Sequence, residues 1–149
     1  MRSSSAWLIG LVLCGGWLGG GAATAAEPAI QVKDAWIRWL PANVPGAGYM
    51  TVTNTGAAAR LLTGASSPDY GEVTMHQTRL RNGMNEMMPV ESVELIPFRP
   101  VRFAEGSYHL MLLHPKRSLQ VGDRVLIALH FAQGPALEIA FEVRAGNAP

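Results

Sequence analysis

The chain has 149 residues, with 12 Lys and Arg against 11 Asp and Glu, 7 Met, 4 His and a single Cys. This length supports one sizeable hydrophobic core, which favours a single domain. A net charge of +1 without a basic run argues against nucleic acid or an anionic membrane as the partner, and one cysteine excludes a disulfide framework and a cysteine-cluster zinc site.

The first 25 residues have the pattern of a secretory signal peptide. A basic residue and three serines precede an apolar run from Ala6 to Leu18, and a segment of small residues follows it. The run is shorter than a transmembrane helix, which needs about 20 residues. Lipid attachment at Cys14 is disfavoured, because Leu13 stands where lipoprotein processing requires a small residue. We therefore expect a signal peptide over 1–25 and a periplasmic, thiol-free domain over 26–149 without a membrane span.

The mature chain consists of short β-type segments separated by turns. Runs rich in Val, Ile, Thr, Tyr and Leu alternate with turns that contain Gly, Asn or Pro, and no window shows a sustained helical period. In chain order the predicted strands are 30–40, 48–54, 60–65, 72–80, 84–88, 93–96, 101–104, 107–113, 124–131 and 136–144. The pair Asn82-Gly83 predicts a tight hairpin between the fourth and fifth strands. Evenly spaced strands with such turns favour an all-β Greek-key sandwich or barrel.

Methionine and histidine are concentrated in one part of the chain. Five of the six methionines after the initiator lie between positions 75 and 111, together with His76 and His109. A single Met is more often a core residue, and a single His is more often structural than a metal ligand. The side-chain directions along the predicted strands are needed to decide between packing and metal binding.

Side-chain alternation separates these two interpretations. In the eighth predicted strand Tyr108, Leu110 and Leu112 share the core face. His109 and Met111 therefore project together from the other face, with Cα atoms about 6.6 Å apart. In the fourth strand Met75 falls on the apolar face and His76 on the opposite one. The hairpin then brings Met87 back towards His76. His109 and Met111 can therefore converge on one ion, and His76 and Met87 can form a second imidazole and thioether pair near them.

The spacing of these four residues resembles that of a known family. His76, ten residues, Met87, twenty-one residues and then His109-Leu110-Met111 match the signature of the periplasmic copper chaperones called PCuAC. Further similar segments are Gly48–Asn54, Gly64–Pro68, Tyr108–Leu112 and Leu119–Asp123. The resemblance implies a cupredoxin-like β-sandwich that binds one Cu(I) through His76, Met87, His109 and Met111. It also implies delivery of copper to the copper A subunit of cytochrome c oxidase or to a thiol-containing Sco-type assembly factor.

The ligand types suit this cargo. Thioether sulfur is soft and imidazole is borderline, so two Met and two His favour Cu(I) over hard cations. Thioethers also need no deprotonation and form no disulfides in an oxidising compartment. Two further residues are candidates at the periphery of the site: His114, which follows the motif strand, and Met84, which would replace Met87 if the hairpin register shifted by one residue.

Other functions receive less support from the sequence. A blue-copper electron-transfer site requires a Cys thiolate, which the exported chain lacks. The sequence contains no nucleophile elbow, zinc-protease motif or phosphate-binding loop, so we expect a monomeric binding protein and no enzyme. Two alternatives stay open: a periplasmic copper sequestration or tolerance protein with the same site, and a β-sandwich binding module without a metal.

Overall fold

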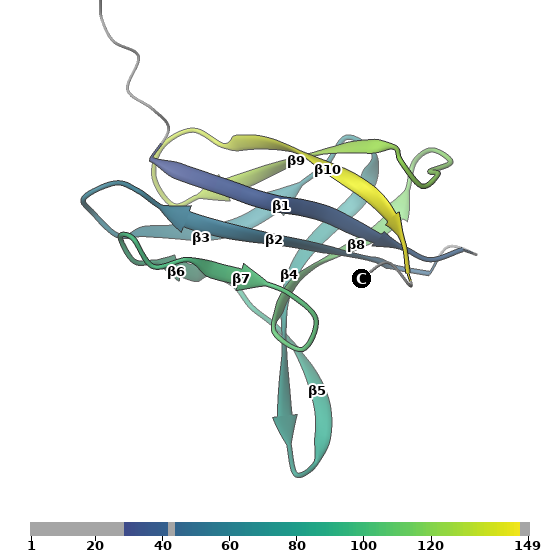
Figure 1. The fold of residues 1–149 in the computed structure, drawn as a ribbon, viewed down its shortest axis with the longest axis horizontal. Helices are drawn as coiled ribbons and strands as arrows, with labels where there is room; N and C mark the ends of the chain where they lie inside the picture. Colours follow the sequence, from purple (N-terminus) through teal and green to yellow (C-terminus); the bar gives the residue numbers. More distant parts are fainter. Residues whose placement is uncertain (1–28, 42–43, 147–149) are drawn as a thin grey trace, which may run out of the picture.

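The computed structural model describes residues 29–41 and 44–146, and the predicted signal peptide lies outside them. Every predicted strand is present, with ends that differ from the prediction by at most two residues. The strands are β1 (Ile30–Trp39), β2 (Gly46–Asn54), β3 (Arg60–Ser66), β4 (Tyr70–Arg81), β5 (Met84–Pro89), β6 (Val93–Leu95), β7 (Val101–Phe103), β8 (Tyr108–Pro115), β9 (Arg124–Phe131) and β10 (Leu137–Ala145) (Figure 1). Within the described residues, no helix has the length and apolar character needed to cross a membrane.

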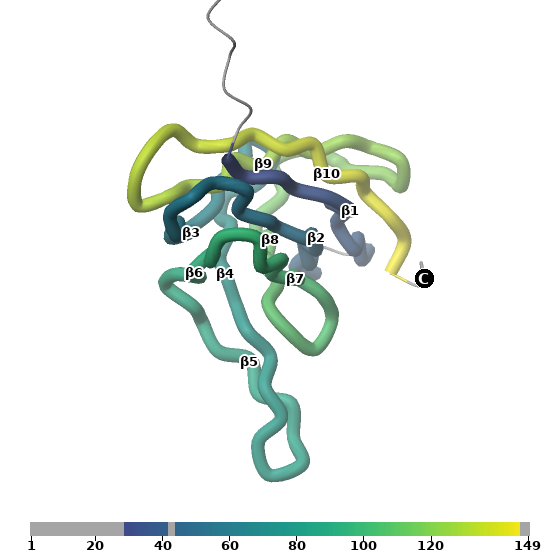
Figure 2. Tube along the Cα trace, turned by 60° about the vertical axis from the view of Figure 1, so that its left-hand side comes forward, coloured from purple at the N-terminus to yellow at the C-terminus, as the bar shows by residue number. Residues whose placement is uncertain are grey.

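The ten strands form one sheet in the order β5-β4-β8-β7-β2-β1-β10-β9-β3-β6. Neighbouring strands are antiparallel except for the pairs β1–β10 and β7–β8, which are parallel. The sheet curls over on itself (Figures 1 and 2). A bridge between Asn54 and Pro97 joins β2 to the segment after β6. The all-β prediction is therefore confirmed, with an open sheet that folds around one core.

Inward-facing residues of the long strands fill this core. Val125 and Ile127 of β9 and Phe141 of β10 are fully buried, as the two-residue period of a strand dictates. Leu110 and Leu112 of β8 are also fully buried. Because these two leucines anchor β8, their neighbours His109 and Met111 are held on the opposite face of the sheet.

The hairpin of β4 and β5 extends away from the body of the molecule (Figures 1 and 2). Its turn is formed by Asn82 and Gly83, whose φ angles of 52° and 77° are those of a type I′ turn. This turn sets the pairing of the two strands, in which Thr78 lies opposite Met87 and Arg81 opposite Met84. The predicted hairpin is confirmed, without a shift in register.

A β-bulge changes the direction of the side chains in β1. The register of β1 on β2 shifts between Lys33 and Trp36, and Asp34 in the bulge has a φ of 53°. The extra residue reverses the alternation of the strand, since one residue moves every later side chain to the other face. As a result Ile37 enters the core and Arg38 faces outward.

Candidate metal site

The four predicted ligands lie on one face of the adjacent strands β5, β4 and β8. His76 of β4 is directly opposite His109 of β8. Its neighbours on the same face of β4 are Thr74, opposite Met111, and Thr78, opposite Met87. Cβ atoms of opposite residues are about 5 Å apart and diagonal neighbours about 7–8 Å. His76 therefore lies at the centre of a cluster that brings all four predicted ligands together.

The two imidazoles face each other and each leaves one nitrogen free. Their ring centres are 5.8 Å apart. Nε2 of His76 is 3.0 Å from Oγ1 of Thr74, and Nδ1 of His109 points to the carbonyl of Ser107 at a long 3.4 Å. Within the described part of the chain, Nδ1 of His76 and Nε2 of His109 are buried without a hydrogen-bond partner. Two buried nitrogens in this state suit a metal ion, because a neutral imidazole binds metals through its unprotonated nitrogen.

A cavity of about 350 Å³ opens beside these residues. Three of the four predicted ligands, Met87, His109 and Met111, line it together with Arg38 and Glu105. His109 is 7% exposed, whereas Met87 on the edge strand β5 is 50% exposed. The site thus has a buried side on β8 and an open side on β5.

Burial keeps His109 in its neutral form. Desolvation lowers the pKa of His109 below the ordinary value of 6.5, and the nearby His76 and Arg38 lower it further. The carbonyl of Ser107 raises the pKa, but this effect is smaller than the effect of burial. At neutral pH the His109 imidazole is therefore available as an uncharged ligand.

The donors on this face are imidazoles and thioethers. Among the residues that the structure describes, no group of three or more His, Cys, Asp or Glu side chains is arranged to hold a metal ion. On this face, the further soft donors near the two imidazoles are the sulfurs of Met87 and Met111. This donor set is soft and neutral, which excludes the sites preferred by calcium and magnesium.

Two peripheral candidates do not reach the cluster. Met84 lies opposite Arg81, on the face of the hairpin that points away from His76. His114 is exposed and lies five residues after His109, which along a strand is about 16 Å. The prediction for Met84 depended on a shifted register, and the Asn82-Gly83 turn does not produce that shift.

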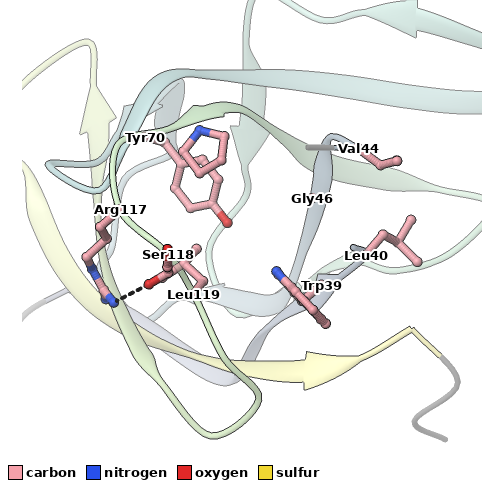
Figure 3. A pocket seen from close by; sticks show the side chains of 9 residues that line it. Trp39, Leu40, Val44, Gly46, Tyr70, Arg117, Ser118 and Leu119 are labelled. Atoms are coloured by element: carbon pink, nitrogen blue, oxygen red, sulfur yellow. Dashed lines mark hydrogen bonds between the residues drawn. The ribbon is translucent and has the colours of Figure 1, made fainter. Parts of the chain in front are cut away.

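A smaller cavity, of about 200 Å³, has a different set of side chains around it (Figure 3). Its lining includes Trp39, Tyr70, Arg117 and Leu119, and the Tyr70 hydroxyl points into it (Figure 3). Among the described residues, neither His nor Met lines this smaller cavity. Its side chains supply no soft ligand, so we assign it no part in metal binding.

Nothing in the sequence alone indicates a role for Arg38. In the structure Arg38 lines the cavity and its Nη1 donates a 3.0 Å hydrogen bond to Glu105, 67 residues further along the chain. The one local signal for its direction is Asp34, since Asp tolerates the left-handed conformation that the bulge requires. That signal does not show which distant residues would lie beside Arg38.

The fold is that of the cupredoxin-like PCuAC domains. A family model described as "Putative lipoprotein LpqE-like" matches residues 30–143, and the chain belongs to this LpqE-like family. Domains of this type are binding domains and not enzymes, in agreement with the prediction from the sequence. The resemblance to PCuAC proteins is thereby confirmed.

Individual proteins support this assignment. "Putative lipoprotein Lxx21020" of Leifsonia xyli subsp. xyli is 29% identical over 143 residues, which cover 94% of this chain and 86% of that protein. The structure described as "Copper-bound PCuAC domain from PmoF2" has a TM-score of 0.66 at 24% identity and covers 79% of this chain and 94% of that one. The structure described as "CuI-DR1885 from Deinococcus Radiodurans" has a TM-score of 0.60 at 27% identity and covers 85% of both chains.

Proposed function

We propose that this protein is an exported copper chaperone that binds one Cu(I) through His76, Met87, His109 and Met111. The observation that carries the proposal is the convergence of these side chains on one face of three adjacent strands, with two buried imidazole nitrogens left without partners in the described structure. A closed-shell d¹⁰ ion accepts the low-coordinate, irregular geometry that such a set provides. The description of the Deinococcus radiodurans protein as a CuI form supports the same ion.

Export is the second part of the proposal. The apolar run near the N-terminus and the description of the family and the Leifsonia relative as putative lipoproteins both support passage across a membrane. We place the signal peptide at 1–25 and the functional domain at 26–149, in the periplasm. Mass spectrometry of the mature protein tests this placement: a chain that retains Cys14 with a lipid would overturn it.

Delivery of the copper follows from the open side of the site. Because Met87 is half exposed on an edge strand, an incoming ligand of a partner can reach a bound ion from that side. The proposed acceptor is the copper A subunit of cytochrome c oxidase or a thiol-containing Sco-type assembly factor. Thiolates bind Cu(I) more strongly than thioethers, so stepwise ligand exchange runs towards such a partner.

An anaerobic Cu(I) titration against a competing chelator tests the site. We expect one Cu(I) per protein, and weaker binding in each of the four variants Met87→Ala, His76→Ala, His109→Ala and Met111→Ala. The chain offers matched controls, Met88→Ala and His130→Ala, which remove an exposed Met and an exposed His that do not face the cluster. Equal affinity of the four variants and the two controls would refute the site.

The biological role requires a second measurement. Deleting the chaperone should impair oxidase assembly when copper is scarce, and the wild-type chain but not the Met87→Ala variant should restore it. Normal oxidase assembly combined with reduced tolerance of high copper would instead indicate sequestration by the same site.

A further inference from the structure

Arg38 lies beside the candidate metal site without being one of its ligands. In β1 it is opposite Ala47 of β2, and Ala47 is in turn opposite Met111 of β8. The three side chains therefore form one row across the sheet, on the face that carries the four ligands. The side chain between the guanidinium and the thioether is a single methyl group, and Arg38 lines the same cavity as Met87 and His109.

Two contacts hold the guanidinium in this place. Its Nη1 donates a 3.0 Å hydrogen bond to Oε1 of Glu105, and its Cζ lies 5.7 Å from the centre of the Tyr49 ring. The ion pair is asymmetric, because the side chain of Arg38 is 29% exposed and that of Glu105 is 81% exposed. Water screens the carboxylate more than the guanidinium, so Glu105, which also lines the cavity, offsets the positive charge of Arg38 only in part.

We propose that Arg38 determines which oxidation state of copper this site retains, by disfavouring Cu(II) relative to Cu(I). The inference rests on the proposed function, since it concerns the same site. A fixed cation repels a divalent ion more than a monovalent one. The four ligands are neutral, so no ligand charge compensates the second charge of Cu(II).

The pKa of His109 gives a second indication that Arg38 acts on this cavity. The charge of Arg38 is one of the causes that lower the pKa of His109, after burial and the neighbouring His76. The same potential that disfavours a proton on His109 disfavours additional positive charge on an ion bound there. The proposal itself depends on the row of side chains and the shared cavity.

The expected effect is large enough to measure. Two strand spacings of about 4.8 Å separate Arg38 from Met111, so the guanidinium lies on the order of 10 Å from the thioether. One extra unit charge at that distance, in a partly exposed site, changes the equilibrium constant by about tenfold. For a one-electron couple, tenfold corresponds to about 59 mV.

The test measures the dissociation constants of both oxidation states on the exported protein. Cu(I) is measured by anaerobic competition and Cu(II) by competition with a second chelator. We expect Arg38→Gln to shift the ratio of the two constants about tenfold in favour of Cu(II), and Arg38→Lys to remain near wild type. Arg99→Gln removes an exposed arginine that does not line the cavity and controls for net charge. Glu105→Gln should shift the ratio the other way, by less, because that carboxylate is exposed.

The outcomes separate this inference from the proposed function. If the wild type binds Cu(I) normally and Arg38→Gln leaves the ratio of the Cu(I) and Cu(II) dissociation constants unchanged, the role of Arg38 is refuted and the proposed function is not. Cu(II) binding that stays undetectable in Arg38→Gln would refute the role of Arg38 in the same way. No Cu(I) binding by the wild type would instead refute the proposed function. If circular dichroism shows that Arg38→Gln does not fold, Glu105→Gln decides: an unchanged ratio, or a shift towards Cu(II), overturns the proposal.

Discussion

The hydrogen bond between Thr74 and His76 should control how well the site binds Cu(I). Nε2 of His76 lies 3.0 Å from Oγ1 of Thr74, and Nδ1 is buried without a partner in the described structure. For Nδ1 to bind a metal, the ring proton must be on Nε2. The Nε2–H group then donates a hydrogen bond to Oγ1 of Thr74. Thr74→Val keeps the shape of the side chain and removes this acceptor. One neutral hydrogen bond contributes about 1 kcal/mol, and loss of a partner of a ligating His weakens metal binding about tenfold.

Two measurements check this prediction. Anaerobic competition gives the Cu(I) affinity, and nitrogen-15 NMR of the copper-free protein reports which nitrogen of His76 carries the proton. We expect about tenfold weaker binding in Thr74→Val with a mixture of tautomers, and near wild-type behaviour in Thr74→Ser, which keeps the hydroxyl. Wild-type affinity and an unchanged tautomer in Thr74→Val would show that Thr74 does not orient the ligand.

Three further predictions concern pH, the fold and oxidation. Because the pKa of His109 is lowered in the folded state, the unfolded chain takes up this proton first as pH falls below 6.5. Urea unfolding of the copper-free protein should therefore give a smaller free energy of unfolding at pH 5.5 than at pH 7.5, and His109→Gln should reduce the difference. Asn54→Ala should cost about 2–4 kcal/mol in the same assay at pH 7.5, because its buried side chain donates to the carbonyls of Ala58 and Leu95 and accepts from the amide of Gly56. A change below about 0.5 kcal/mol would contradict this account. Peroxide should oxidise the exposed Met87 before the buried Met75, as peptide mass spectrometry can establish. Cu(I) binding should be lost as Met87 sulfoxide forms, before Met75 is oxidised.

Alternation along the strands made most of the candidate cluster predictable. The sequence separates Met75 from His76 because neighbours on a strand face opposite sides, and Met75 is indeed buried while His76 is on the outer face with His109. The hairpin register was also predictable, since Asn-Gly specifies the type I′ turn that aligns Thr78 with Met87. Both inferences use contacts between residues close in sequence or on paired strands.

The surroundings of the cluster were not predictable in the same way. Arg38 faces the site because the bulge at Asp34 reverses the alternation of β1, and a bulge has no strict sequence signature. Its partner Glu105 lies on a turn that comes near only because β2 stands between β1 and β7. Asn54 likewise has no signal in the sequence for its buried bonds to the segments around Ala58 and Leu95. Such contacts depend on the strand order, which local patterns do not specify.

The uneven burial of the proposed ligands supports the proposed transfer role over storage. His109 is buried on a strand that has neighbours on both sides, so its position is fixed by the core beneath it. Met87 is half exposed on the edge strand β5, which has a neighbour on one side only. A storage site gains kinetic stability by enclosing all its ligands, whereas a chaperone needs one ligand that a partner can displace while the others retain the ion. In the proposed transfer, the partner's first ligand therefore replaces Met87, and the two imidazoles and Met111 hold the copper until the exchange is complete.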